Sequence, residues 1–294
     1  MNAPAEGRDA AMVAGGDAPA VGVAGAEAAS AAGDIARAAN ASAAPRPWLA
    51  AVGRLFFRSR DLLFPLVLLP LLAFTKPRLP FGSPTADTVL DALGALVALS
   101  GQLLRALVIG LAYIRRGGLD RRPYADALVC EGLFAHSRNP LYLGNLLGII
   151  GFALIHSSPW LYAVGVPFFV FAYLAIVAAE EEFLRGRFGA DYEAYAREVP
   201  RFLPRLRGLH ATIAGMTFDW RRLARKEYGT TFAGASALLL LLVFDRQRLY
   251  GPLAARWWLA LALWLPLLAG YVTLRRLKKT GRLGRDPIIP RATG

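Results

Sequence analysis

Six apolar segments, separated by short or basic connections, constrain this chain more than any other feature of its sequence. A helix that crosses a bilayer needs about 20 largely apolar residues, and each segment approaches that length. The segments lie near Leu62–Phe74, Thr88–Ile114, Leu141–Ile155, Pro159–Ala179, Thr230–Phe244 and Arg256–Leu274. With 55% hydrophobic residues and a mean hydropathy of +0.39, the 294-residue chain is typical of a polytopic membrane protein. We therefore expect an all-α membrane helical bundle of about six transmembrane helices.

The basic residues predict the orientation of this bundle. From residue 46 onward, 26 Lys and Arg residues precede the first segment, follow the last, or lie in the connections on that same side, against five on the other side. Basic loops stay in the cytoplasm, so we expect both termini to be cytoplasmic (N-in, C-in). The net charge of +13 is then a topology signal that can also attract anionic lipid headgroups, and it does not require a nucleic-acid partner.

Two further compositional features bound the function. Residues 1–45 are rich in Ala and Gly and carry no periodicity of large apolar residues, so we expect a disordered tail. The single cysteine, Cys130, excludes a disulfide framework within the chain and a CxxC metal site. The three histidines are scattered without metal-site spacing, and we expect no protein-bound metal.

The connection between the third and fourth segments carries the main geometric prediction. His156-Ser-Ser-Pro159 is too short for anything but an antiparallel helical hairpin. The start of the third segment at Arg138–Pro140 and the end of the fourth at Glu180–Glu182 should therefore meet at one membrane surface.

Each polar residue near this surface has a structural and a functional interpretation. Arg138-Asn139-Pro140 is either a capped helix start or a seat for a carboxylate or phosphate. Gly144 and Gly148 favour close helix packing, which also allows a ligand to approach the backbone. The acids Glu180–Glu182 either pair with nearby arginines or hold a cationic or hydroxyl-rich ligand.

Arg105 is a separate candidate within the second segment. An ionisable residue at membrane depth costs about 2.5–3.5 kcal/mol on insertion scales and by default indicates a functional site. The alternative is that Arg105 lies near the cytoplasmic end and extends to the headgroups.

Two sequence elements together resemble a known family. The first is GLFAHSRNPLYLG at residues 132–144, and the second runs from EEEFLRGRFGADYEAY at 180–195 to Val-Pro-Arg at 199–201. In this order, and separated by one helical hairpin, they resemble the isoprenylcysteine carboxyl methyltransferase and phospholipid methyltransferase family, in a bacterial-type form. The match covers about a quarter of the chain. It divides the chain into a tail (1–45), a membrane methyltransferase core (46–208) and a C-terminal extension with two transmembrane helices (209–294).

The resemblance implies an integral-membrane methyltransferase that uses S-adenosylmethionine and modifies a lipophilic acceptor. It places the cofactor carboxylate at Arg138 and its amino group or ribose hydroxyls at Glu180 and Glu181. It implies further cofactor contacts at a set of residues around the start of the third segment, namely Asn139, Pro140, Tyr142 and Gly144. We expect this site to face the cytoplasm from the bacterial inner membrane.

The catalytic residues depend on the acceptor. For a carboxylate acceptor, Arg105 could position the substrate without a base. An amine acceptor requires a base, for which Glu131 and His136 are the candidates. Asn139 stands where the best-known eukaryotic members of the family have a histidine, which removes a titratable group from that position.

Two other classes of protein fit the same sequence. One is an NADPH-dependent sterol-type membrane reductase, and the other is a non-enzymatic scaffold or small transporter. Neither a dinucleotide-binding GxGxxG loop nor an inverted repeat of the apolar segments is evident.

Overall fold

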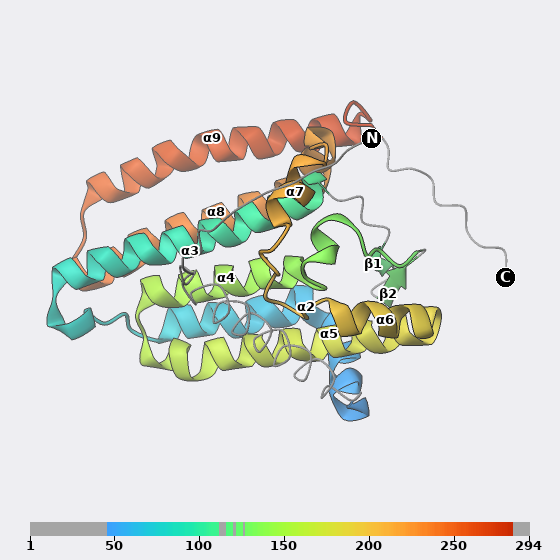
Figure 1. The fold of residues 1–294 in the computed structure, drawn as a ribbon. Coiled ribbons are helices and arrows are strands. Elements are labelled where there is room, and N and C mark those ends of the chain that lie inside the picture. The colour runs from blue at the N-terminus through green and yellow to red at the C-terminus, as the bar shows by residue number, and fades with distance from the viewer. Residues whose placement is uncertain (1–45, 112–115, 120–121, 126, 285–294) are drawn as a thin grey trace, which may run out of the picture. The chain divides into compact units, whose positions relative to one another are not determined.

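The computed structural model describes residues 46–111, 116–119, 122–125 and 127–284, and the predicted tail 1–45 lies outside this range. The six apolar segments form six main helices (Figure 1), which are α2 (Pro47–Phe74), α3 (Pro84–Leu111), α4 (Pro140–His156), α5 (Val166–Phe188), α8 (Trp220–Tyr250) and α9 (Ala254–Lys279). The all-α membrane bundle is thereby confirmed. The number of membrane crossings and the N-in, C-in orientation stay predictions.

Shorter elements connect the main helices. Between α3 and α4 lie a two-stranded antiparallel hairpin of β1 (Arg116–Leu119) and β2 (Arg122–Ala125) and the turn η2 (Gly132–Ala135). The others are η1 (Pro80–Gly82), the π-helical turn η3 (Leu161–Gly165), α6 (Ala190–Glu198) and α7 (Leu209–Ala214). The hairpin was not expected from the sequence.

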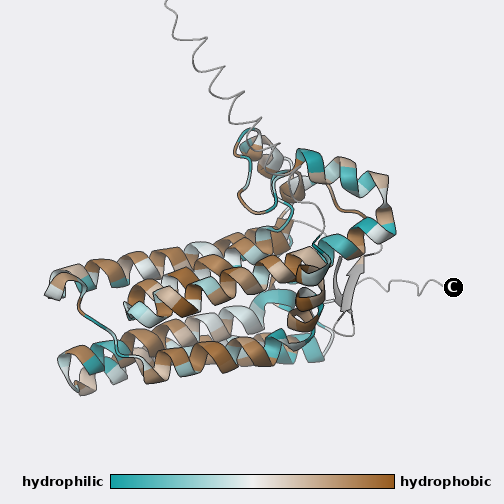
Figure 2. Ribbon diagram, turned by 90° about the horizontal axis from the view of Figure 1, so that it is seen from below, coloured by the Kyte–Doolittle hydropathy of each residue, from teal (hydrophilic) through white to brown (hydrophobic). Residues whose placement is uncertain are grey.

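Four helical stretches of the described chain are long and apolar enough to cross a membrane: Pro84–Leu111, Leu161–Phe188, Trp220–Tyr250 and Ala254–Lys279. Helix α4 is apolar but shorter. Figure 2 shows hydrophobic residues along the long helices, with hydrophilic residues concentrated toward their ends. The protein is therefore an integral membrane protein.

Two of the helices begin well upstream of the apolar segments that predicted them. Helix α2 begins at Pro47 and continues through Pro65 and Pro70, upstream of the expected start at Leu62. Helix α8 begins at Trp220 rather than at Thr230, because the Asp219 carboxylate accepts a hydrogen bond from the backbone N–H of Arg222 at 2.9 Å and caps the helix. Hydropathy alone misses such polar helical turns.

Two pairs of helices run side by side in the bundle: α3 with α4, and α2 with α5 (Figure 1). Helix α8 packs on α3 and α4, and α9 packs on α8. We call the end of the bundle where α4 begins the Arg138 end, and the opposite end, where α4 stops, the His156 end.

Glycines set the close approach of α3 and α4. A Cβ atom on Gly101 would lie 2.4 Å from the carbonyl oxygen of Gly144, and one on Gly151 would lie 2.5 Å from that of Gly94. By contrast, a Cβ atom on Gly148 would meet no atom within 4 Å. The two predicted packing residues therefore differ: Gly144 leaves room for α3, whereas Gly148 contributes only its backbone nitrogen, 3.2 Å from a Cβ atom on Gly101.

A buried polar cluster joins three helices at the His156 end. The Nδ1 atom of His156 lies 2.9 Å from Oδ2 of Asp245 on α8, and its Nε2 atom lies 2.7 Å from Oγ1 of Thr75, which follows α2. His156 and Asp245 are both buried. This cluster fixes α8 to α4 at the far end of the bundle.

The glycine contacts can be tested by comparing two substitutions one turn apart on α4. Gly151→Ala places a methyl group against the backbone of α3, and such overpacking costs about 1–3 kcal/mol. Gly148→Ala is the control and should leave the thermal unfolding temperature in detergent unchanged or slightly raised. Equal melting temperatures for the two variants would contradict the close approach at Gly151.

Candidate functional site

The residues before α4 are held by the loop that follows α6. The backbone N–H of Arg138 donates to the carbonyl oxygen of Pro200 at 2.9 Å, and Ser137 Oγ donates to that of Phe202 at 2.7 Å. Asn139 Nδ2 donates to the carbonyl oxygen of Arg201 at 3.1 Å. Three consecutive residues thus clamp onto one loop, which fixes the direction of the Arg138 side chain.

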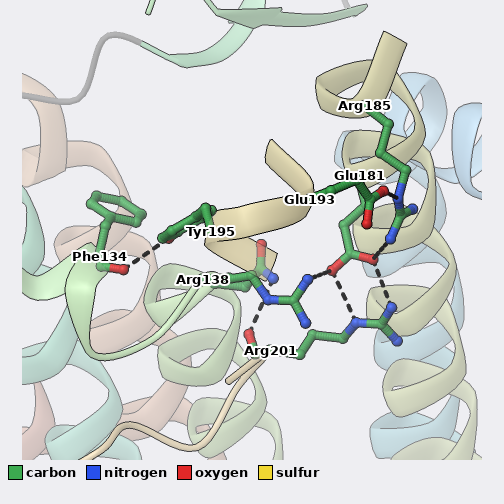
Figure 3. A network of polar contacts seen from close by, with 8 residues as sticks. Phe134, Arg138, Glu181, Arg185, Glu193, Tyr195 and Arg201 are labelled. Carbon is green, nitrogen blue, oxygen red and sulfur yellow. Dashed lines mark hydrogen bonds and ion pairs between the residues drawn. The ribbon is translucent and has the colours of Figure 1, made fainter. Parts of the chain in front are cut away.

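Glu181 on α5 is the centre of the polar cluster at the Arg138 end (Figure 3). Arg138 Nη1 donates to its Oε1 atom at 2.9 Å, and Arg201 donates from Nε and Nη2 to the two oxygens at 3.0 and 2.6 Å. Arg185 Nη2 lies 3.7 Å from Oε2. The predicted meeting of the α4 start with the acids of the next helix is therefore observed.

Three arginines and three acids meet at this end of the bundle. Three guanidiniums face Glu181 and Glu193, the latter accepting from Arg185 Nε at 2.8 Å, and Glu180 lies next to Glu181 on α5. Arg138 and Glu181 are only 3% and 2% exposed, so their electrostatic interactions are weakly screened. The N–H groups of the guanidiniums and of the start of a helix suit an anionic group of a ligand.

The two neighbouring acids have different partners. Successive residues on a helix point about 100° apart, so three acids in a row face three directions. Glu180 accepts from the Tyr142 hydroxyl at 2.6 Å, and Glu182 pairs with Arg54 of α2 near the surface. The expectation that these acids end the helix was wrong: α5 continues to Phe188 and stops at Gly189, whose positive φ of 50° breaks it.

Helix α6 lies against the cluster and contributes Glu193 to it. The Tyr195 hydroxyl donates to the carbonyl oxygen of Phe134 at 2.8 Å, which ties α6 to η2. Burial, with a smaller effect of the Glu181 carboxylate, raises the pKa of Tyr192 to about 12. The Tyr192 phenol therefore stays neutral at physiological pH beside the charged groups.

The surroundings of the two candidate bases, His136 and Glu131, differ from those of the arginines around Glu181. His136 is buried, with Nδ1 at 2.7 Å from the carbonyl oxygen of Arg205 and Nε2 at 2.9 Å from the Thr212 hydroxyl. A carbonyl oxygen only accepts, so Nδ1 carries the proton in that contact. Glu131 is exposed at the start of η2.

Arg105 lies deeper in the bundle, between α3, α4 and α8. Its Nη2 and Nε atoms donate to the two oxygens of Glu227 at 2.6 and 3.2 Å, and Nη1 donates to Asn145 Oδ1 at 2.6 Å. Gly144 leaves room for this side chain, because a Cβ atom there would lie 2.7 Å from Cγ of Arg105. Several predicted residues thus lie around Glu181 at the Arg138 end, and two others, Arg105 and Gly144, lie deeper in the bundle.

Sequence reasoning left several of these contacts unassigned. Arg201 belongs to the Val-Pro-Arg part of the second element, and this position could have indicated a further arginine at the site. Glu227 was taken as part of a basic connection, because the fifth segment was started too late. Asn145 has no signal beyond its position one turn after Tyr142.

Comparison with known proteins agrees with this geometry. Residues 92–191, which include Arg138, Tyr142, Glu180 and Glu181, match the family model for phospholipid methyltransferase. This segment belongs to the phospholipid methyltransferase family. No solved structure gives a significant match.

Two curated bacterial proteins are similar to part of the chain. The cobalt-zinc-cadmium resistance protein CzcN of Cupriavidus metallidurans is 38% identical over 81 residues, which are 28% of this chain and 37% of that protein. The nickel-cobalt-cadmium resistance protein NccN of Alcaligenes xylosoxydans xylosoxydans is 35% identical over 114 residues, which are 39% of this chain and 48% of that protein. The matched region thus spans less than half of either relative.

The central role of Glu181 can be tested by comparison with its neighbour. Glu181→Gln removes the carboxylate shared by three arginines, and breaking a buried pair in this way costs about 3–5 kcal/mol. Glu182→Gln removes a solvent-exposed pair, worth at most about 1 kcal/mol. Thermal unfolding in detergent should show a large loss for the first variant and a small one for the second, and similar losses would contradict the assignment.

Proposed function

We propose that this protein is an integral-membrane methyltransferase that uses S-adenosylmethionine and methylates a lipophilic acceptor. The observation that carries the proposal is the arginine-rich cluster around Glu181, which is built from the matched family segment and completed by Arg201. The fold supports it as well, since the cluster lies at the end of an apolar helical bundle.

The residues of the cluster suit the charged groups of this cofactor. Its carboxylate suits the guanidiniums of Arg138 and Arg201, and its amino group or ribose hydroxyls match Glu180 and Glu181. The first turn of α4 adds backbone N–H groups that favour an anion, although Pro140 itself has none. Tyr142 holds Glu180 in place through its hydroxyl.

The reaction needs little covalent help from the protein. The cofactor supplies a methyl group on a sulfonium, which is open to in-line displacement by a nucleophile of the acceptor. Orientation of two reactants can lower a barrier by about 7–11 kcal/mol, and the chain's part is to hold both in line. We propose that α6 limits the access of water at the Arg138 end. We also propose that the acceptor reaches the site from the bilayer, between helices.

The acceptor is a lipid or a prenylated molecule with a carboxylate or an amine. The arginine-rich chemistry of the site supports methyl transfer rather than metal binding, because guanidiniums have no lone pair to offer to a metal. The metals in the names of the two relatives are therefore not carried over as ligands. We place the protein in the bacterial inner membrane with the cluster facing the cytoplasm, where its basic loops also contact anionic lipids.

Binding of S-adenosylmethionine to the purified protein in detergent, measured by calorimetry, tests the proposal. Arg138→Ala should weaken binding by about tenfold or more, since a hydrogen bond to a charged group is worth about 1.5–3 kcal/mol. Arg187→Ala, an exposed arginine near the end of α5, is the control and should bind as the wild type does.

Two outcomes would contradict this function. One is binding of NADPH in place of S-adenosylmethionine, which would favour the reductase alternative. The other is the lack of methyl transfer from labelled S-adenosylmethionine to any component of a total lipid extract.

A further inference from the structure

The Arg105–Glu227 ion pair lies outside the cluster around Glu181 and joins the family segment to a helix beyond it. Glu227 is 3% exposed and belongs to α8, whereas the match to the family ends at residue 191. Both oxygens of Glu227 accept from Arg105, and Gln102 contributes a further donor at 3.5 Å. The guanidinium is therefore held in one orientation.

The depth of this pair places it directly inside the Arg138 end of the bundle. Arg105 precedes the last residue of α3 by six positions, Asn145 follows the first residue of α4 by five, and Glu227 follows that of α8 by seven. At about 1.5 Å per residue, all three lie about 7–11 Å inside the helix ends. The pair thus lies slightly deeper in the bundle than Tyr142, measured from the Arg138 end.

A continuous series of contacts leads from this pair to Glu180. Arg105 Nη1 can only donate, so Asn145 turns its Oδ1 atom toward it, which leaves its amide nitrogen as the donor for the nearby Tyr173 hydroxyl. The Tyr173 ring contacts the Tyr142 ring with centroids 5.5 Å apart. The Tyr142 hydroxyl then donates to Glu180 at 2.6 Å.

We propose that Glu227 is a positioning residue for the cofactor site: it fixes Arg105, which orients Asn145 and so holds Tyr173 and Tyr142 against Glu180. The inference rests on the proposed function, because Glu180 is assigned there to the cofactor. It gives α8 a role in cofactor binding, and it makes Arg105 a structural partner of Glu227 rather than a group that meets the acceptor.

The His156–Asp245 pair provides a matched control, because it too joins a helix of the family segment to α8. It lies at the other end of α4, sixteen residues from Pro140 and therefore about 24 Å away along the helix. If Glu227 only fastens α8 to the bundle, loss of either pair should have similar effects. If Glu227 positions the cofactor site, only loss of the Arg105 pair should change cofactor binding.

The experiment measures the dissociation constant for S-adenosylmethionine and the kcat and KM of methyl transfer in detergent. Glu227→Gln should raise the dissociation constant about 2- to 30-fold, the range found for residues that act through others. Asp245→Asn should lower the melting temperature and leave the dissociation constant unchanged. The double variant Arg105→Met with Glu227→Met keeps the packing without buried charge, so it should fold. It should nevertheless bind S-adenosylmethionine more weakly than the wild type does.

A double-mutant cycle with Tyr142→Phe tests the route itself. If the effect of Glu227 reaches the cofactor through Tyr142, the two losses should be clearly less than additive. Additive losses, an unchanged constant in Glu227→Gln, or an equal change in Asp245→Asn would overturn the inference while the proposed function stands. A wild-type protein that does not bind S-adenosylmethionine would overturn both.

Discussion

The Glu181 carboxylate is the interaction on which the Arg138 end of the molecule depends. Through Arg138 it joins α5 to the segment that precedes α4, and through Arg201 it joins α5 to the loop after α6. Arg185 lies close to it on α5 itself. Burying these charges carries a desolvation cost that apolar side chains would not have. A contribution to stability therefore does not explain why the protein has this cluster. Its three arginines support the proposed binding of an anionic group.

Helix packing makes this arrangement possible. The two-residue turn at Ser157 and Ser158 sends α5 back along α4, so that charged residues distant in sequence meet at one end. Gly94, Gly101 and Gly151 bring α3 so close to α4 that Arg105 must extend past Gly144 toward α8. The positions of both polar groups thus follow from apolar contacts made along the whole length of the bundle.

The sequence was sufficient for features that depend on chain length and local pattern. The apolar segments predicted the main helices, and the short connection predicted the contact between Arg138 and the acids of α5. The sequence could not predict which acid of Glu180–Glu182 would turn inward, since this depends on the rotation of α5 about its axis. It also could not pair Arg105 with Glu227, because the register of α8 against α3 is set by tertiary packing.

The same difference bears on how a family match should be interpreted in a chain of this kind. Residues 92–191 contain the acids and the arginine of the candidate cofactor site, yet three partners of that region come from elsewhere: Arg54, Arg201 and Glu227. A buried charge requires its counter-ion whichever part of the chain supplies it. The helices outside the matched segment are therefore physically part of the site's electrostatics, and the free energy of holding Arg105 inside the bundle depends on α8. A family segment without α8 would leave that guanidinium buried and uncompensated, so the C-terminal helices and the core depend on each other.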